Sequence, residues 1–501
     1  MDFLKLKSGS DVRGVAIGDN ASLTSDVARS LGLAFAKWLS GKTGKPESGL
    51  SISLGRDSRL SGESLLRAAA EGIFIGGAKP VSLGMCTTPA MFMSTITEGF
   101  DFDGAIMITA SHHPFDRNGL KFFTKDGGVE SEDIETLLKM ASEYSLAAQP
   151  DMVLSQSAFL PVYCAHLKTR ILKGLDTDVA KPLLGLHVVV DAGNGAGGFY
   201  ADFLEELGAW VEGSQFLEPD GRFPNHIPNP ENPDAMESIS KAVIAAGADL
   251  GVIFDADCDR AAIVDEKGRP INRNRLIALI SAVLLDAKSG GTIVTDSVTS
   301  SGLTEFINAW GGVHFRYKRG YRNVIDEAVR LNADGIDCPL AIETSGHAAL
   351  RENYFLDDGM YLVTVLLSEA MKRKQAGQSL CDLIFDLREP VEALELRLNI
   401  LTEDFKKTGH EAINRVLDAA SHDPALDIAT DSREGVRIYF DLDGKHQSGW
   451  YMMRLSVHDP VLPINVESDV AGGCKLMLAS LKNALEGMSG IDFTPIDKAC
   501  K

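Results

Sequence analysis

The chain has 501 residues and a formal charge of -21, and 45% of its residues are hydrophobic while 24% are charged. One hydrophobic core seldom serves so long a chain, so we expect three or four domains of ~100–150 residues each. The acidic balance argues against a nucleic-acid partner, which needs a basic face, and the composition argues against large disordered regions. A local cluster of Arg and Lys can still attract a small anion.

No targeting segment or membrane span is predicted. Residues 1–7 contain no apolar core, and the longest apolar run, about 276–285, is too short to cross ~30 Å of hydrocarbon. The seven cysteines are scattered and form no Cys-x-x-Cys pair, so we expect reduced thiols in the core. We expect a soluble, cytoplasmic protein with no membrane partner.

Short apolar runs alternate with helical segments through about residue 385, which predicts α/β domains. The predicted buried strands are, in chain order, 50–54, 104–109, 186–190, 250–254, 292–295 and 340–342. The predicted helices are 64–75, 202–207, 236–246, 275–286, 301–308 and 324–331.

The pattern changes in the last part of the chain. Residues 436–440 and 450–455 predict a hairpin around Asp443 and Gly444, and a helix is predicted over about 470–485. Polar or Pro-containing seams suggest four domains. Their predicted limits are 1–157, 158–272, 273–388 and 389–501.

Three aspartates, Asp255, Asp257 and Asp259, follow the predicted strand 250–254 at alternate positions. If the chain turns there, the carboxylates converge and repel one another by several kcal/mol unless a cation lies among them. The pattern therefore predicts a site for a hard divalent metal. A solvated acidic turn is the alternative, because Asp is common in turns.

A serine motif follows the predicted strand 104–109. Ser111 is flanked by His112 and His113, and Lys121 comes soon after. A serine on a turn beside imidazoles and a lysine is a candidate nucleophile or phosphoryl carrier. No Gly-x-Ser-x-Gly elbow surrounds it, which disfavours an acyl-transfer hydrolase. By itself, the motif also fits a capping serine with surface histidines.

A third motif, Glu343, Ser345 and His347, follows the predicted strand 340–342. Glu and Ser on such a turn can bind neighbouring hydroxyls of a sugar, and His347 can exchange a proton near pH 7. A buried histidine whose hydrogen bonds are satisfied is the ordinary alternative.

Basic groups are interleaved with these motifs. Arg13, Arg56 and Arg59 lie near turns of the N-terminal domain, where a guanidinium group can grip phosphate with two hydrogen bonds. Arg56 and Arg59 could equally pair with local acids.

Glycines at 193, 195 and 198 imitate the spacing of a dinucleotide-binding loop, with Glu212 further along the chain. A dehydrogenase would not explain the aspartate and sugar motifs. We therefore expect these glycines to permit close packing of a helix.

Taken together and in this order, the serine loop, the Asp-x-Asp-x-Asp-Arg loop and the Glu-x-Ser-Gly-His loop resemble the α-D-phosphohexomutase superfamily. The resemblance spans nearly the whole chain and includes residues 55–59, 191–198 and 220–230. It implies a four-domain α/β architecture around a central cleft: three related mixed α/β domains and a C-terminal α+β domain with an antiparallel sheet.

The resemblance implies a phosphoserine at Ser111 and magnesium held by a phosphoserine oxygen and the carboxylates of Asp255, Asp257 and Asp259. It also implies sugar contacts from Glu343 and Ser345. The remaining expected catalytic residues are Lys121 and His347 as general base and acid, Arg13 as an assistant, His112 as a support for the phosphoserine, and Arg260 as a stabiliser of transition-state charge.

The implied reaction moves a phosphoryl group between the 1- and 6-positions of a hexose, with a hexose 1,6-bisphosphate as intermediate and activator. This intermediate must turn over in the site, which requires a remote phosphate clamp. We assign the clamp to Arg454 and Ser456, with Arg56 and Arg59 as further substrate-binding residues.

The sequence departs from the family pattern in several loops. The usual clamp, Arg-x-Ser-Gly-Thr-Glu-Pro or Arg-x-Ser-Asn-Thr-x-Pro, reads Arg-Leu-Ser-Val-His-Asp-Pro over 454–460. Val457 offers no side-chain amide, and Asp459 adds negative charge near an anion. Ala256 and Cys258 replace the usual glycines of the metal loop, and His113 replaces the usual Asn.

Thr109 before the serine, together with the segment 343–359, favours the phosphomannomutase/phosphoglucomutase group over phosphoglucosamine mutases. We therefore expect mannose or glucose phosphate as the small-molecule partner, bound by a monomer or a homodimer. The alternatives are a phosphoglucosamine mutase and a catalytically weak homologue that binds sugar phosphate and regulates another process.

Overall fold

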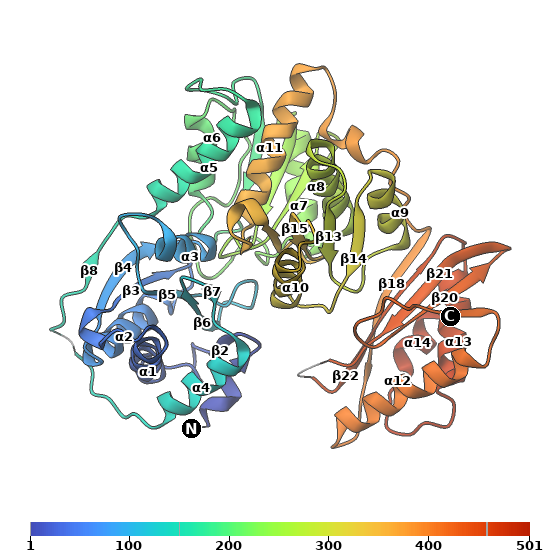
Figure 1. Cartoon of the computed structure of the whole chain (residues 1–501), viewed down its shortest axis with the longest axis horizontal. Coiled ribbons are helices and arrows are strands. Elements are labelled where there is room, and N and C mark those ends of the chain that lie inside the picture. The colour runs from blue at the N-terminus through green and yellow to red at the C-terminus, as the bar shows by residue number, and fades with distance from the viewer. Residues whose placement is uncertain (1, 150, 457–458, 501) are drawn as a thin grey trace. The chain divides into compact units, whose positions relative to one another are not determined.

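The computed structural model describes residues 2–149, 151–456 and 459–500, and the chain divides into two compact units (Figure 1). The first unit contains residues 1–276 and 345–383, and the second contains residues 277–344 and 384–501. The chain passes between them three times: within α8 (Arg273–Ala287), between Thr344 and Ser345, and within the short η4 (Leu380–Ile384).

The N-terminal part of the first unit is a mixed eight-stranded sheet with the strand order β1-β2-β6-β5-β3-β4-β8, in which β7 pairs with β6. Helices α1 and α2 lie on one face of this sheet and α3 lies on the other (Figure 1). The elements are η1 (Phe3–Leu6), β1 (Lys7–Ser8), β2 (Asp11–Val15), α1 (Ser25–Thr43), η2 (Glu47–Gly49), β3 (Ser51–Arg56), α2 (Gly62–Ile75), β4 (Lys79–Met85), α3 (Thr88–Ile96), β5 (Gly104–Ile108), β6 (Arg117–Thr124), β7 (Gly127–Gly128), α4 (Ser131–Ser142) and β8 (Ser155–Gln156).

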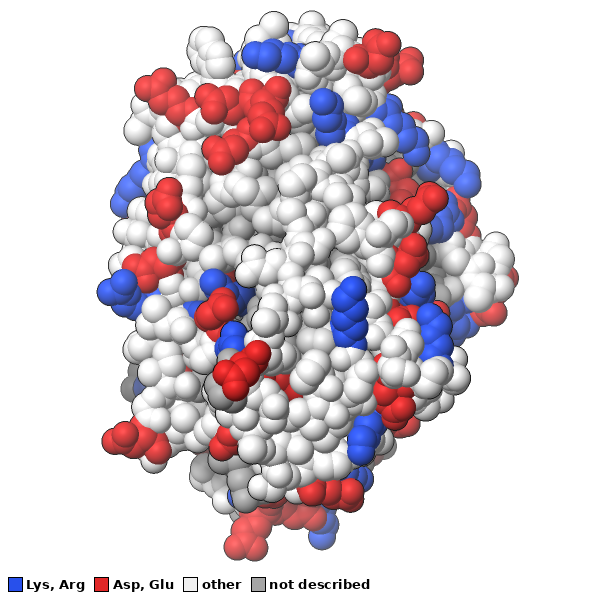
Figure 2. All heavy atoms as spheres, turned by 90° about the vertical axis from the view of Figure 1, so that its left-hand side faces the viewer, with Lys and Arg blue, Asp and Glu red and all other residues white. Residues whose placement is uncertain are grey.

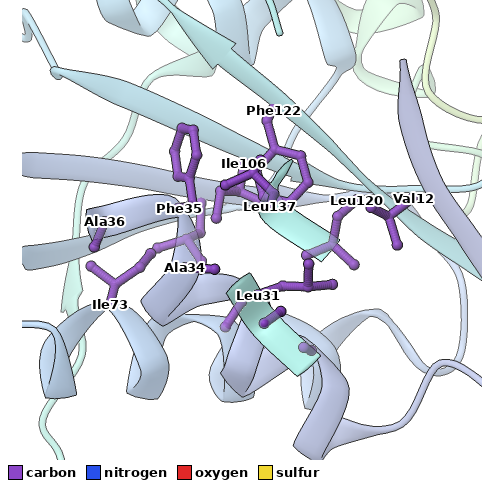
Figure 3. Packing of buried hydrophobic residues seen from close by; sticks show 14 of the residues in the cluster. Val12, Leu31, Ala34, Phe35, Ala36, Ile73, Ile106, Leu120, Phe122 and Leu137 are labelled. Carbon is purple, nitrogen blue, oxygen red and sulfur yellow. The ribbon is translucent and has the colours of Figure 1, made fainter. Parts of the chain in front are cut away.

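The core of this sheet domain is formed where α1 meets the sheet (Figure 3). Leu31 and Phe35 of α1 are fully buried, and the Phe35 ring lies 5.0 Å from the Phe122 ring of β6. Burying a side chain of this size contributes ~1.5–3 kcal/mol. The helix begins after Thr24, whose hydroxyl accepts a hydrogen bond from the Val27 N–H, which satisfies one of the free donors of the first turn.

The rest of the first unit contains a second sheet with the order β12-β11-β10-β9, in which β9 and β10 are parallel and β10 and β11 are antiparallel. Because β9 and β10 are parallel, their carboxyl ends lie at one edge, and the aspartate loop begins there. The elements are α5 (Leu160–Leu175), β9 (Val188–Asp191), α6 (Phe199–Glu206), α7 (Pro233–Ala246), β10 (Leu250–Phe254), β11 (Ala261–Asp265), β12 (Pro270–Ile271), β16 (Ala348–Leu350), η3 (Arg351–Asn353), β17 (Leu356–Asp357) and α11 (Gly359–Gln375).

The second unit contains a three-stranded parallel arrangement, β14-β13-β15, and a C-terminal antiparallel sheet with the order β18-β22-β21-β20-β19. Helices α12, α13 and α14 pack against the C-terminal sheet to form its core. The elements are β13 (Thr292–Thr295), α9 (Ser301–Ala309), β14 (Val313–Arg316), α10 (Tyr321–Ala333), β15 (Leu340–Ile342), β18 (Glu392–Asn399), α12 (Phe405–Ser421), β19 (Leu426–Ile428), β20 (Val436–Leu442), β21 (Lys445–Met453), β22 (Val461–Ser468), α13 (Gly473–Ala484) and α14 (Thr494–Ala499).

The predicted fold class is confirmed: mixed α/β domains precede a C-terminal domain with an antiparallel sheet. The strands predicted at 250–254, 292–295 and 340–342 are β10, β13 and β15, and the predicted hairpin is formed by β20 and β21 around Asp443 and Gly444. The domain limits given above stay a prediction.

The surface and the cysteines agree with the composition of the chain. Figure 2 shows one face of the molecule, on which Lys and Arg side chains lie among Asp and Glu side chains. All seven cysteines are free thiols; four are buried, as predicted, whereas Cys164, Cys381 and Cys500 are only partly buried. Among the described residues, no helix combines the length and the apolar character that crossing a bilayer requires.

Candidate active site

The aspartate loop connects β10 to β11 and is buried. Asp255, Asp257 and Asp259 have no solvent exposure, and oxygen atoms of their three carboxylates lie within 4.8 Å of one another. The loop turns through Cys258, which has a φ of 65°, and is closed by the backbone N–H of Arg260, which donates to Asp255 Oδ1 over 3.1 Å. The solvated acidic turn considered from the sequence is therefore wrong.

The three carboxylates of this loop are buried and repel one another, which is energetically unfavourable when all three are charged. Burial, and then the negative charges of Asp259 and Asp257, raise the pKa of Asp255 well above its ordinary range. Burial alone would also raise the pKa of Asp259, but the positive charges of Lys121, His347 and Arg260 together outweigh it, so the pKa of Asp259 is lowered.

The aspartate loop fits a hard cation. Its donor atoms are all carboxylate oxygens, which Mg²⁺ prefers. Oδ1 of Asp257 and Oδ1 of Asp259 are buried, and neither accepts a hydrogen bond within the described part of the chain. A cation among these oxygens would relieve both the repulsion and the unmet hydrogen-bonding capacity.

The serine loop connects β5 to β6 and brings Ser111 to the aspartates. Ser111 is buried, and its φ of 52° lies in the left-handed region, which is unfavourable for a residue with a side chain. Its hydroxyl donates a hydrogen bond of 2.8 Å to Asp255 Oδ2. The predicted nucleophile and the predicted metal site are therefore adjacent.

Two cationic groups lie beside this pair. Nη2 of Arg260 lies 3.4 Å from Ser111 Oγ and donates over 2.6 Å to His112 Nδ1. Because guanidinium only donates, His112 Nδ1 accepts and this histidine is neutral; burial, and then Arg260, lower its pKa. The Lys121 ammonium forms a close ion pair with Asp259 and lies 3.3 Å from Asp257 Oδ2.

His347 lies close to the same aspartates and is oriented by a carboxylate. Its Nδ1 donates over 2.6 Å to Asp357 Oδ2 and lies 3.8 Å from Asp259 Oδ1. Burial lowers the pKa of His347, but the charges of Asp357 and Asp259 and the hydrogen bond to Asp357 together outweigh it, so the net direction is upward. Burial raises the pKa of Asp357 to about 6, even though His347 opposes this shift.

The three arginines of the N-terminal domain differ in their surroundings. Arg13 on β2 donates over 2.7 Å to Asp11, and Arg56 donates over 2.9 Å to Glu63. The Arg59 side chain has no exposure and pairs with Asp57. The alternative of a local acid partner is found for both Arg56 and Arg59. The Arg59 donors are taken up inside the protein. Substrate binding by these two arginines stays a prediction.

The sugar and phosphate motifs are divided between the units. Ser345 is buried in the turn before β16 of the first unit. In the second unit, Glu343 follows β15 and accepts a 2.6 Å hydrogen bond from the Gly320 N–H, while Arg454 follows β21. Burial, and then the Arg319 guanidinium, lower the pKa of Arg454.

The clamp loop is described only in part. Ser456 Oγ accepts a hydrogen bond of 3.2 Å from the Asp459 N–H, and Asp459 is exposed. Val457, which we named as a departure from the family pattern, lies outside the described residues, as does His458.

Two further partners complete the site, and we did not predict either contact. Thr88, at the start of α3, donates from Oγ1 to Asp257 Oδ2 over 2.5 Å. A local motif carries no signal for such a contact. Asp357 lies in the segment 343–359, from which we predicted only the substrate group. Its position shortly after His347 was the one indication in the sequence that the two side chains pair.

The glycine run after β9 packs against the aspartate loop. A Cβ atom at Gly195 would lie 2.7 Å from the Cα of Ala256, and one at Gly198 would lie 2.0 Å from the carbonyl oxygen of Leu217. Close approach is therefore the role of these glycines, as we expected from the sequence.

A buried serine hydroxyl held against three converged carboxylates and beside a guanidinium group defines a site of the phosphoryl-transfer class. Three family models match the chain: the alpha/beta/alpha domains I, II and III of phosphoglucomutase/phosphomannomutase, over residues 5–145, 161–268 and 272–390.

Individual proteins match over nearly the full length. The chain is 30% identical to a phosphomannomutase/phosphoglucomutase of Pseudomonas aeruginosa over 482 residues, with 95% of each covered. It is 31% identical to a phosphomannomutase of Salmonella montevideo over 487 residues, covering 95% of this chain and 97% of the relative. A solved structure of a phosphoglucomutase/phosphomannomutase family protein from Burkholderia thailandensis matches with a TM-score of 0.79 at 27% identity, covering 97% of this chain and 98% of that one. The chain belongs to the phosphoglucomutase/phosphomannomutase family.

Proposed function

We propose that the protein interconverts hexose 1-phosphate and hexose 6-phosphate, with mannose or glucose as the sugar, through a phosphoserine at Ser111. One observation carries the proposal: Ser111 Oγ lies 2.8 Å from Asp255 within the buried aspartate loop. A hydroxyl in this position can carry a phosphoryl group beside a bound metal. A serine with a purely structural role would not need to lie against these carboxylates.

Asp255, Asp257 and Asp259 are the residues that would hold Mg²⁺, and a phosphoserine oxygen would complete the set. When bound, the metal supplies positive charge that stabilises the anionic transition state of phosphoryl transfer. Arg260 supplies a second, permanent positive charge beside Ser111 Oγ.

The phosphoryl group leaves Ser111 Oγ for the free hydroxyl of a hexose monophosphate. The bond from phosphorus to Oγ breaks as the bond to the sugar oxygen forms. The hexose 1,6-bisphosphate then turns over and returns its other phosphoryl group to Ser111, so that one site serves both ends of the sugar. Free hexose 1,6-bisphosphate activates the enzyme by phosphorylating Ser111.

In the first transfer the sugar hydroxyl loses its proton. In the return transfer the Ser111 hydroxyl loses its proton and the departing sugar oxygen gains one. We assign these protons to Lys121 and His347 as general base and acid. His347 is suited to the role because Asp357 holds its Nδ1–H, which fixes the tautomer with Nε2 as the acceptor. His112 is neutral and adds no positive charge to the site. It accepts a hydrogen bond from Arg260, and this bond orients the guanidinium group. Arg13, on β2, is assigned as an assistant in this proton transfer.

Four residues are assigned to the parts of the substrate that do not react. Glu343 and Ser345 bind sugar hydroxyls, and Arg454 with Ser456 holds the distant phosphate. The lowered pKa of Arg454 reflects burial close to Arg319, and an anion would relieve the repulsion between the two cations.

The competing assignments predict different substrates. A phosphoglucosamine mutase would prefer glucosamine phosphate, and a regulatory homologue would bind sugar phosphates without turnover. The monomeric or homodimeric state and the cytoplasmic location stay predictions from the sequence.

Turnover of glucose-, mannose- and glucosamine-1-phosphate, each with and without hexose 1,6-bisphosphate, tests the proposal. We expect turnover of the glucose or mannose substrate that rises with the bisphosphate. Preference for glucosamine-1-phosphate would contradict the sugar assignment, and absence of turnover with all three would contradict the enzymatic function.

A further inference from the structure

The Arg59 guanidinium gathers the backbone of the serine loop. Nη1 donates to the carbonyl oxygens of Pro114 and Arg117, over 2.7 and 2.8 Å. Nη2 donates to the carbonyl oxygens of Ser111 and His113, both over 2.6 Å. One side chain therefore binds four carbonyl groups of the loop that carries the nucleophile.

Asp57 links Arg59 to the backbone N–H of Ser111 through Thr109. Its carboxylate accepts from the backbone N–H of Arg59 over 3.0 Å and from Nε of Arg59 over 3.2 Å. It also accepts from Thr109 Oγ1 over 2.7 Å, and Thr109 Oγ1 in turn accepts from the Ser111 N–H over 2.9 Å. The Asp57–Arg59 pair thus reaches both the N–H and the carbonyl group of Ser111.

The serine loop needs such a hold because Ser111 has a φ of 52°. A residue with a side chain keeps this conformation only when its surroundings impose it. The same backbone conformation directs the hydroxyl to Asp255 Oδ2. Without its hydrogen bonds to Arg59, the serine loop would no longer be held in this conformation.

A segment of the second sheet domain covers Arg59 from outside. The Phe223 ring lies 5.1 Å from the guanidinium carbon of Arg59. Gly221 packs so closely that an added Cβ would lie 2.4 Å from the carbonyl oxygen of Ser58 and 2.6 Å from the Cα of Arg59. The segment 220–224, which the sequence singled out and the proposed reaction does not use, thereby acquires a role.

We propose that Arg59 is a positioning residue for phosphoryl transfer, which holds the serine loop so that Ser111 Oγ faces the aspartates, and that Phe223 keeps Arg59 in place. The proposal rests on the proposed function for its kinetic consequence. Its structural consequence, a loosened serine loop, is independent of any activity.

Arg59→Lys tests the proposal, because lysine keeps the charge beside Asp57 but cannot offer five donors in a planar fork. We expect kcat to fall by about 100-fold, KM to change by less than about threefold, and Ser111 phosphorylation by hexose 1,6-bisphosphate to slow as much as kcat. Hydrogen exchange in residues 109–117 should become faster, with or without substrate.

Arg29→Lys is the matched control. Arg29 is likewise buried in the N-terminal domain and pairs with Glu71 and Asp26, but it has no hydrogen bond to the serine loop. We expect this variant to lose thermal stability while kcat and the exchange of residues 109–117 stay at wild-type values.

The covering ring gives a second, milder pair of variants. Phe223→Leu removes the aromatic face and should lower kcat by about tenfold, whereas Phe223→Tyr keeps the face and should restore wild-type kcat. A general packing defect would not distinguish the leucine and tyrosine variants in this manner.

Wild-type kcat and wild-type exchange of residues 109–117 in Arg59→Lys would overturn the proposal. So would equal losses of kcat in the Arg59 and Arg29 variants, since these would reflect general stability. If wild-type protein takes up no phosphate at all, the proposed function fails, while the exchange of residues 109–117 still decides whether Arg59 holds the loop.

Discussion

At the scale of single residues, Ser111 lies between opposite charges. Its hydroxyl donates to Asp255 over 2.8 Å, and Nη2 of Arg260 lies 3.4 Å from the same oxygen. A phosphate on this oxygen would repel the aspartates unless a cation compensated. The arrangement therefore links the phosphorylated state of Ser111 to the occupancy of the aspartate loop.

Asp257→Asn should weaken Mg²⁺ binding by about tenfold, because it takes one formal charge from the aspartate loop. The amide oxygen can still accept from Thr88, so the fold should persist. Titration of activity against Mg²⁺ should show partial recovery at high metal concentration, while the exposed Asp418→Asn serves as control. Full activity of the wild-type protein in EDTA would contradict the metal assignment.

Arg454→Ala should remove a charge-assisted contact to the distant phosphate, which costs ~1.5–3 kcal/mol. We expect kcat/KM to fall by about 10- to 100-fold, while hexose 1,6-bisphosphate still phosphorylates Ser111. Arg415→Ala, a change to an arginine that donates to the Glu486 carbonyl oxygen, is the control. An unchanged kcat/KM across the substrate panel would show that the clamp loop does not bind substrate.

The residue types of the site were predictable, but their partners were not. Three aspartates at alternate positions predict a cation site if they converge, because converged carboxylates repel one another. Their burial, which excludes the solvated turn, is known only from the fold. An arginine near a turn, by contrast, fits a phosphate and a set of carbonyl groups equally well. Only the fold shows that Arg59 faces Ser111 and Pro114, because those partners lie more than fifty residues away.

At the scale of elements, the loop 220–230 is tied to β9 by one histidine. His226 Nε2 lies 3.0 Å from Asp191 Oδ2, and both side chains are buried. Burial lowers the pKa of His226, but Asp191 outweighs it, so the pKa lies above the ordinary value of 6.5. Protonated His226 therefore stabilises the loop that carries Phe223.

His226→Gln should destabilise the protein more at low pH than at high pH. Since the folded pKa is raised, the stabilisation is fully present below the unfolded pKa of about 6.5 and is lost as the pH rises through the folded pKa. Urea unfolding should show a loss of ~1.5–3 kcal/mol near pH 6 and a smaller loss near pH 9. An equal loss at both pH values would contradict the ion-pair account.

The sequence predicts some elements better than others for a physical reason. β10 and β15 are short, buried apolar runs, and β13 is a buried run of the β-branched residues Thr, Ile and Val, so composition alone marks them. β6 contains Arg117, Asn118 and Lys121, which interrupt the apolar run, and it was not among the predicted strands. These polar residues are there because β6 extends from the serine loop and delivers Lys121 to the aspartates.

At the scale of the whole molecule, the C-terminal sheet has a hydrophobic core formed by its own strands and helices. Leu478 of α13 is fully buried in the core of the C-terminal sheet, whereas Ser111 and the aspartate loop belong to the first unit. Multidomain chains commonly depart from two-state unfolding. The stability of the C-terminal domain should therefore be separable from the chemistry at Ser111.

Leu478→Ala should lower the stability of its domain by ~2–5 kcal/mol, because it leaves a cavity in the core. Calorimetry should show two transitions in the wild-type protein, with only one of them shifted in the variant. Phosphorylation of Ser111 should continue below that transition. A single transition that moves as a whole would show that the units unfold together.

The central claim is that Ser111 carries the phosphoryl group, and intact-mass measurement after incubation with hexose 1,6-bisphosphate and Mg²⁺ tests it most directly. We expect one phosphate on the wild-type protein, located at Ser111 by peptide mapping, none on Ser111→Ala, and a loss of turnover by orders of magnitude in that variant. Phosphate uptake by Ser111→Ala equal to that of the wild type, or turnover that survives the substitution, would contradict the account.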